Sequence, residues 1–339
     1  MVLSLTRMMR QILSPIAAFA LFASLCHAFA PVVHKHAISS PKPSKTFRVA
    51  HEFSDSQASK CTASRGSSTS LGSLSDSVTN LATSLFRYQG PVPLVQAFGI
   101  NGVLFALLQT KLNTMLTPSG FTSSLILGTG LWASMGWRGW TLCVLYLFLG
   151  QAVTKVRFEE KEKRGIAEGR GGRRGPENVW GSALTALICA ICSVQDDSFL
   201  GISSQLYQLG YVAALATKLS DTFASEIGKA YGKTTFLITT LDRVEPGTEG
   251  AVSAEGTAAA LVGGSLLPLY GWAVGLISGP SVVVATIAAF VACNVESLIG
   301  ATLQEKKGFE WMSNEVVNFI NTLVGAGLAF LVGTVIVGL

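Results

Sequence analysis

Long apolar stretches, separated by a few compact clusters of charge, are the feature that most limits how this chain can fold. A bilayer-spanning helix needs about 20 mostly apolar residues. Eight stretches approach or meet that length, at residues 92–112, 119–136, 138–154, 179–195, 199–219, 252–277, 280–303 and 315–338. The second and third are short and meet at Trp137-Arg138-Gly139, so a count of seven is the alternative. The sequence therefore predicts an all-α fold, a polytopic transmembrane helical bundle of about seven to eight helices within residues 79–339.

The amount and location of charge agree with a membrane protein. Charged residues make up 13% of the 339 residues, about half the share of a soluble domain. The net charge of +5 lies entirely in residues 1–78, and the remainder balances 17 basic against 17 acidic residues. A basic surface for nucleic acid is therefore excluded, because it would need an excess of Lys and Arg in the folded part.

The N-terminal 78 residues have the composition of targeting signals. Arg7 and Arg10 precede an apolar stretch that ends in Cys26-His27-Ala28, which predicts a signal peptide over residues 1–28. Residues 29–78 are rich in Ser and poor in acids, which predicts a disordered, transit-like segment. The junction at Phe29 resembles the bipartite presequence of algae with red-algal-type plastids. We therefore expect an integral protein of a plastid (chloroplast) membrane, the alternative being a secreted or ordinary membrane protein with a disordered linker.

Three charge clusters follow the third, fifth and seventh stretches. The first cluster (residues 155–177), the second (218–255) and the third (296–315) hold 29 of the 34 charges outside the N-terminal segment. Alternate loops lie on one side of a membrane, so the three clusters should form a one-sided polar site. The first holds eight basic and five acidic residues, and the positive-inside rule places it on the side of insertion. In a plastid that side is the stroma.

The second cluster carries the most informative pattern. If the helix continues past Lys218, two adjacent stripes form at helical spacing: Asp221-Ser225-Gly228-Gly232 and Thr222-Glu226-Lys229-Lys233. Asp221 and Glu226 would offer carboxylates to a divalent ion, and Lys229 and Lys233 would offer ammonium groups to phosphate oxygens. The alternative is a solvated helix end with incidental ion pairs.

A glycine-rich loop follows in the same cluster. Thr248, Gly250 and Ser253 lie where backbone N–H groups can point at an anion, just before the next helix. Glu249 and Glu255 would repel a bare phosphate, so they fit better if a metal ion lies between. A plain loop with a helix cap is the alternative.

Polar residues in the other clusters are further candidates. Glu296 shares one face of the seventh stretch with Gly300 and Gln304, and Asn314 and Asn318 share one face of the eighth. Polar side chains at helical spacing in such stretches should face the protein interior. Helix packing explains the asparagines equally well. Arg173 and Arg174 stand among glycines and suit phosphate groups, or else the anionic heads of membrane lipids.

Together these motifs resemble those of the integral-membrane family that contains the plant plastid phytyl-phosphate kinase. The matching segments are 171–178, 221–228, 247–257, 296–301 and 314–318. The resemblance implies transfer of the γ-phosphoryl group of CTP, or another nucleoside triphosphate, to phytyl monophosphate, giving the diphosphate used for tocopherol (vitamin E) and phylloquinone. Family members in organisms without plastids leave the substrate open, and the plastid-type presequence favours the phytyl substrate.

The leading hypothesis is thus a lipid-phosphate kinase that uses Mg²⁺ as cofactor. Asp221 and Glu226, with Glu255, would bind the metal, and Glu296 would orient the metal or the acceptor. The other candidates fall into two groups: Lys229, Lys233, Thr248, Gly250, Ser253, Arg173 and Arg174 for phosphates, and Asn314 and Asn318 for the acceptor. A nucleotidyl transferase acting on a lipid phosphate would use the same groups. A small-solute transporter would instead place its ionisable residues near the bilayer midplane.

Overall fold

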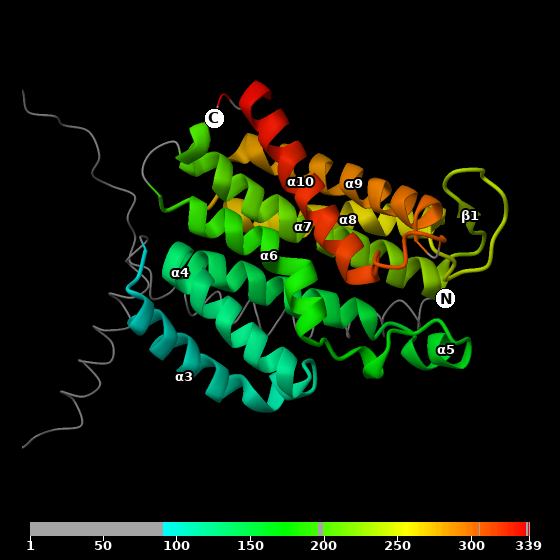
Figure 1. Cartoon of the computed structure of the whole chain (residues 1–339), viewed down its shortest axis with the longest axis horizontal. Helices are drawn as coiled ribbons and strands as arrows, with labels where there is room; N and C mark the ends of the chain where they lie inside the picture. The colour runs from blue at the N-terminus through cyan, green and yellow to red at the C-terminus, as the bar shows by residue number, and fades with distance from the viewer. Residues whose placement is uncertain (1–90, 196–198, 305, 337, 339) are drawn as a thin grey trace, which may run out of the picture. The chain divides into compact units, whose positions relative to one another are not determined.

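The computed structural model describes residues 91–195, 199–304, 306–336 and 338 (Figure 1). The predicted signal peptide and transit-like segment lie outside these residues. Seven long helices account for most of the described chain: α3 (Leu94–Asn113), α4 (Pro118–Thr154), α6 (Pro176–Cys192), α7 (Ser204–Tyr231), α8 (Ala254–Ala273), α9 (Gly279–Thr302) and α10 (Asn314–Ile336). The prediction of an all-α helical bundle is confirmed.

Short elements lie in the charge clusters. Helix α5 (Phe158–Lys163) and a 3₁₀ turn (Arg170–Gly172) belong to the first cluster, and a second 3₁₀ turn (Phe199–Gly201) precedes α7. In the second cluster β1 (Phe236–Leu237) pairs antiparallel with β2 (Ala251–Val252), with Phe236 opposite Val252. This two-stranded ribbon shapes the loop that the sequence predicted to bind phosphate.

Helix α4 contains two of the predicted stretches. At Gly136 the backbone turns to φ 60° and ψ −155°, a conformation open essentially only to glycine. A Cβ atom on Gly128 would lie 3.1 Å from Nε1 of Trp140, although twelve residues of straight helix span about 18 Å. The two halves therefore fold back on each other, and the Trp132 and Trp140 rings pack edge to face with centroids 5.4 Å apart. Helix α4 thus accounts for two of the eight predicted stretches, and α3, α6, α7, α8, α9 and α10 account for the other six.

Local sequence fixes where the helices begin. The side chains of Thr117, Ser203 and Ser253 accept hydrogen bonds from the first turns of α4, α7 and α8, which satisfies N–H groups that a helix start leaves unpaired. Pro118 and Pro176 stand at the first positions of α4 and α6, where the missing N–H group is harmless.

Helix α7 is the centre of the bundle, packed against α4, α6, α8, α9 and α10 (Figure 1). Close approach depends on small residues: a Cβ on Gly210 would clash with Phe330 of α10, and one on Gly263 of α8 would clash with Phe223. Lipid does not drive apolar helices together, so such tight contacts supply much of the stability. The central position of α7 brings its polar C-terminal half to the ends of the surrounding helices.

The outer surface of the bundle is apolar. Val95, Leu107, Leu331 and Val335 are 84%, 77%, 68% and 83% exposed, as expected for side chains that face lipid. By length and composition alone, α9 and α10 are the two described helices that qualify as membrane spans.

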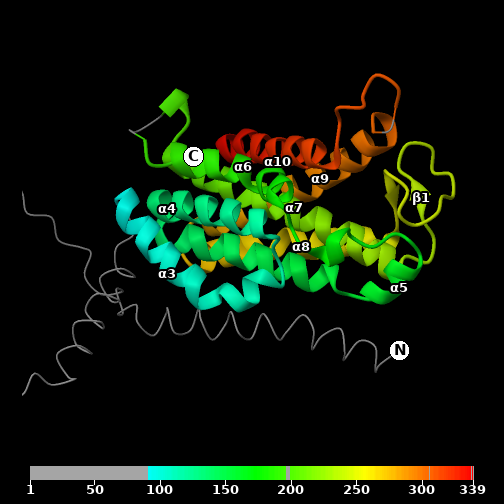
Figure 2. The same cartoon turned by 60° about the horizontal axis from the view of Figure 1, so that its bottom comes forward.

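The three charge clusters meet at one end of the bundle. Both views place α5 and β1 at the same end (Figures 1 and 2), and the loop between α9 and α10 lies there as well. At the opposite end Arg138, two residues after Gly136, donates to the carbonyl of Gly275 in the turn between α8 and α9 (Figure 1). The charges are thus gathered on one side, as the alternation of the clusters predicted.

Candidate functional site

A polar cavity of about 440 Å³ lies where the three clusters meet. Its walls come from α4, α6, α7, α8, α9 and α10 and from the loops between them. Five basic and five acidic residues line it: Arg170, Arg173, Arg174, Lys218 and Lys229, and Glu168, Asp221, Glu249, Glu296 and Glu315. Mixed charge of this kind suits a ligand that carries both phosphates and a metal ion.

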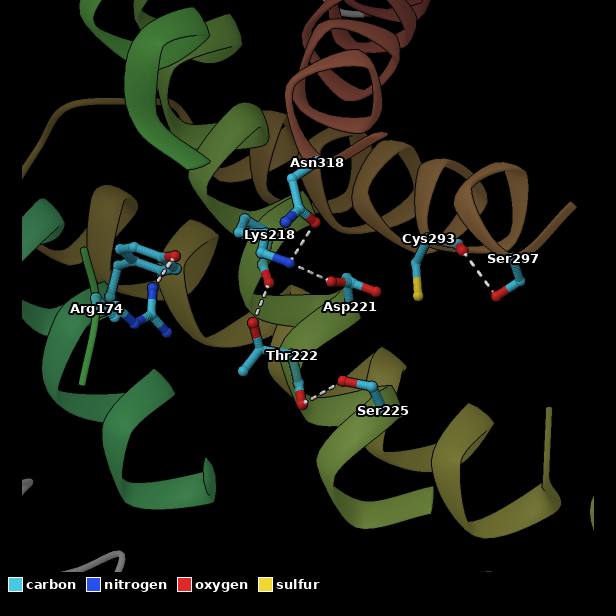
Figure 3. Close-up of polar contacts among 9 residues, drawn as sticks. Arg174, Lys218, Asp221, Thr222, Ser225, Cys293, Ser297 and Asn318 are labelled. Carbon is cyan, nitrogen blue, oxygen red and sulfur yellow. Dashed lines mark hydrogen bonds and ion pairs between the residues drawn. The ribbon is translucent and has the colours of Figure 1, made fainter. Parts of the chain in front are cut away.

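Lys218 joins two helices at the centre of this polar cavity (Figure 3). Its ammonium group donates hydrogen bonds to the Asp221 carboxylate, one turn further along α7, and to Oδ1 of Asn318 on α10, at 2.6 Å. The side chains of Lys218 and Asp221 are only 12% and 10% exposed. The ion pair therefore holds Asp221 in one orientation, and Asn318 secures the lysine.

Helix α9 brings a second carboxyl group to Asp221. Glu296 lines the same cavity as Asp221, and the charges of Asp221, Lys218 and Glu249 act on its side chain. Two carboxylates close together repel each other unless a proton or a cation lies between them, so a divalent cation bound here would relieve that repulsion.

The donor set fits Mg²⁺ bound together with a phosphate ligand. Among the described residues, no group of three or more His, Cys, Asp or Glu side chains forms a metal cage. Mg²⁺ is usually held by one or two carboxylates, with water and substrate phosphates completing its six ligands. Asp221 and Glu296 supply that number of carboxylates.

Glu226 lies away from the polar cavity, contrary to the prediction. Its side chain is 1% exposed and forms an ion pair with Lys161 of α5, whose ammonium group also donates to the carbonyl oxygen of Thr154. Five residues along a helix turn the side chain by about 140° relative to Asp221. The two carboxylates therefore point to different neighbours, and Glu296 takes the place beside Asp221.

Two more predicted residues do not line the polar cavity. Lys233 is exposed just beyond the end of α7, and Glu255 is half-buried in the first turn of α8. The other predicted residues do line it: Arg173, Arg174, Lys229, Thr248, Gly250, Ser253, Asn314 and Asn318.

The hydroxyl groups of the glycine-rich loop are used to build the loop. Ser253 accepts a hydrogen bond from the N–H of Gly256 at 3.1 Å, and Thr248 donates to the carbonyl of Glu245 at 2.8 Å. A Cβ on Gly250 would lie 2.5 Å from that of Ala301, so glycine lets the loop approach α9. These hydroxyl groups therefore cap α8 and close the turn, as the alternative of a plain loop with a helix cap predicted. The loop still forms one wall of the cavity.

Arg174 is a rigidly held cation. Its guanidinium donates to the hydroxyl of Tyr146 and lies 5.0 Å from the centroid of that ring. A Cβ on Gly150 would lie 2.5 Å from Nη2 of the arginine, so this glycine leaves the space that the side chain occupies. The backbone N–H of Arg174 donates a hydrogen bond to the carbonyl of Met115, and its carbonyl accepts one from the N–H of Thr117, in the loop between α3 and α4. Arg173, in contrast, is exposed.

Three site residues were missed from sequence. Lys218 stands three residues before Asp221, a spacing that predicts an ion pair on a helix. Glu249 was considered beside a metal ion in the predicted loop, but it was not chosen as one of the site residues. Tyr146 had no local signal, because it meets Arg174 from 28 positions away.

Comparison with known proteins identifies the family. The family model described as "Integral membrane protein DUF92" matches residues 101–326. The chain belongs to this integral-membrane family. The DUF92 match spans all the residues that line the polar cavity, and the resemblance inferred from the motifs is confirmed.

Several DUF92-like relatives cover most of the membrane part. An uncharacterised membrane protein of Synechocystis is 51% identical over 251 residues, 74% of this chain and 95% of its own. "Protein VTE6, chloroplastic" of Arabidopsis thaliana is 44% identical over 231 residues, 68% of this chain and 69% of its own. An uncharacterised membrane protein of Methanocaldococcus jannaschii is 33% identical over 66% of this chain and 89% of its own. No solved structure matches the chain.

Proposed function

We propose that this protein is a lipid-phosphate kinase that transfers the γ-phosphoryl group of CTP, or another nucleoside triphosphate, to phytyl monophosphate. The observation that carries the proposal is a single cavity lined by the carboxyl groups of Asp221 and Glu296 and by the cations Lys229, Arg173 and Arg174. The sequence motifs support the reaction, and the identity to the chloroplastic VTE6 supports a role in plastids.

The reaction needs positioning and charge neutralisation more than proton transfer. An oxygen of the acceptor phosphate attacks the γ-phosphorus, the bond to the oxygen bridging to the β-phosphate breaks, and the nucleoside diphosphate leaves. The attacking oxygen is already anionic, so a general base is not required. The four histidines of the chain are His27, His34, His36 and His51, all outside the family match.

Six of the lining residues have a role in this scheme. Asp221 and Glu296 would hold Mg²⁺, which when bound supplies positive charge to the nucleotide phosphates. Lys218 keeps Asp221 in place, and Lys229 and Arg173 neutralise phosphate oxygens. Arg174, fixed by Tyr146, orients the phosphate of the acceptor.

We also propose that the protein resides in a plastid membrane with the polar cavity facing the stroma. The presequence pattern and the chloroplastic relative support the organelle. The basic excess of the first cluster supports the orientation. Nucleotide and acceptor phosphate would then both be reached from the stromal side.

A product analysis tests the proposed reaction. Membranes that contain the full chain are incubated with phytyl phosphate, Mg²⁺ and CTP labelled in its γ-phosphate. We expect the label to appear in phytyl diphosphate, with unlabelled CDP as the second product. Chelation of Mg²⁺ should stop turnover, and added Mg²⁺ should restore it. Transfer of CMP with release of diphosphate would indicate a nucleotidyl transferase instead. A lack of turnover with every prenyl phosphate and nucleotide tried would contradict both enzymes.

Asp221→Asn tests the metal site. The amide keeps the shape of the side chain but carries no charge, so we expect kcat to fall by about 100-fold or more, with the protein still in the membrane. The matched control is Asp242→Asn, since Asp242 is exposed on the loop between β1 and β2 and should leave kcat unchanged. Full activity in both Asp221→Asn and Glu296→Gln would remove the proposed metal site.

A further inference from the structure

A second, apolar cavity adjoins the polar one. It has a volume of about 60 Å³ and lies between α3, α4 and α6. Its lining is largely aliphatic and aromatic and includes Leu127, Leu131, Val144, Leu147, Val179 and Ala183. Such a lining suits hydrocarbon and offers little to a nucleotide base or a sugar.

Three residues belong to both cavities: Arg174, Asn178 and Ser182. The two spaces therefore meet at one border, and Arg174 is the cation at that border. Tyr146, which holds the guanidinium, lines the apolar cavity itself. A molecule with an anionic head and a hydrocarbon tail matches this order, because its head meets Arg174 when its tail fills the apolar cavity.

Building on the proposed function, we propose that the apolar cavity binds the isoprene unit next to the phosphate of the acceptor, with Arg174 contacting that phosphate. A volume of about 60 Å³ is less than half of the roughly 150 Å³ cavity that takes up benzene, so it receives the first carbons of that isoprene unit while the rest of the tail extends beyond it. The adjacent polar cavity keeps the nucleotide on the other side of the acceptor phosphate. The chain thus selects its acceptor through contacts separate from those that bind CTP.

Val144→Phe tests the cavity by filling it. We expect KM for phytyl phosphate to rise about tenfold or more, while KM for CTP stays within about twofold. The matched control is Ile126→Phe, because Ile126 lies on the same helix, is 58% exposed and does not line the apolar cavity. Equal effects of the two variants, or a rise in KM for CTP alone, would overturn the assignment.

Photolabelling of the unaltered protein gives a second test that does not depend on turnover. The probe is a prenyl monophosphate with a diazirine on its first isoprene unit, added to membranes that contain the full chain. We expect label on peptides that contain Val144 or Ala183, and we expect unlabelled phytyl phosphate to compete for it. Label confined to other helices, or label that is not displaced and so reports a bilayer lipid, would overturn the assignment.

The two proposals fail in different ways. Competed label on these peptides without phosphoryl transfer leaves the lipid-binding site standing and contradicts the kinase. Phosphoryl transfer with label elsewhere leaves the kinase standing and contradicts the lipid-binding site.

Discussion

At the scale of single residues, Gly136 determines whether α4 can fold back on itself. Its φ of 60° and ψ of −155° lie where a Cβ atom clashes with the backbone, so we expect Gly136→Ala to lower the free energy of unfolding by about 1–3 kcal/mol. The loss should appear as a lower midpoint of thermal unfolding in detergent micelles. The opposite end of the bundle would thus be weakened without any change in the polar cavity.

A second glycine provides the control for this residue. Gly102 lies within α3, and a Cβ there would have no atom within 4 Å. Alanine is favoured over glycine inside a helix by about 0.5–1 kcal/mol, so Gly102→Ala should be neutral or slightly stabilising. If both alanine variants unfolded at the same temperature, strain at Gly136 would not be the reason that glycine is needed.

At the scale of elements, α5 is fastened to the C-terminal end of α7. Besides the buried pair of Lys161 and Glu226, Arg157 donates to the carbonyl of Ala230 at 2.9 Å and Arg164 to that of Lys229 at 3.2 Å. Cations are favourable at the carbonyl end of a helix. Since the chain runs from α5 into the loop that carries the cavity arginines, this attachment fixes one wall of the cavity.

The buried pair predicts a specific double-variant result. Lys161→Met leaves the carboxylate of Glu226 unpaired, so we expect a loss of about 3–5 kcal/mol of stability. Adding Glu226→Leu should restore much of it, because two apolar side chains then replace the pair. Chemical denaturation of the two variants measures the difference.

The same double variant separates the two roles considered for Glu226. A carboxylate that only holds α5 can be replaced, so the double variant should keep the Mg²⁺ concentration dependence of the unaltered protein. If the double variant is stable but its activity requires far more Mg²⁺, Glu226 contributes to the metal site after all.

At the scale of the whole molecule, the three charge clusters should be accessible from the same side of the membrane. Cysteines placed at Lys163, Asp242 and Lys307 sample one cluster each, and all three positions are exposed. In sealed, oriented vesicles of a chain with its native cysteines replaced, we expect a membrane-impermeant maleimide to label the three together. Ser278→Cys, in the exposed turn between α8 and α9, should react only from the other side. Labelling of any of these three cysteines from the same side as Ser278→Cys would contradict this topology.

The whole fold was more predictable from sequence than the site. Bilayer thickness sets the length of an apolar helix, so the spans could be located. The junction predicted to begin at Trp137 lies one residue from the turn observed at Gly136. The stripe that contains Asp221 followed from helical periodicity. The partner of Asp221 did not, because the choice between Glu226 and Glu296 depends on which face of α7 meets α9. The ion pair of Lys161 and Glu226 joins positions 65 residues apart, and no local pattern encodes such a contact.

The bond between Lys218 and Asn318 has a consequence for biosynthesis. When the helices insert in chain order, α7 stands in the membrane before α9 and α10 reach it. Until those two helices arrive, Asp221 lacks Glu296, and Lys218 lacks its amide partner. The carboxyl pair therefore forms only when the last span is in place, and a prematurely terminated chain would present phosphate-binding cations without the group that holds the metal. Insertion of the last span thus acts as the step that assembles the site.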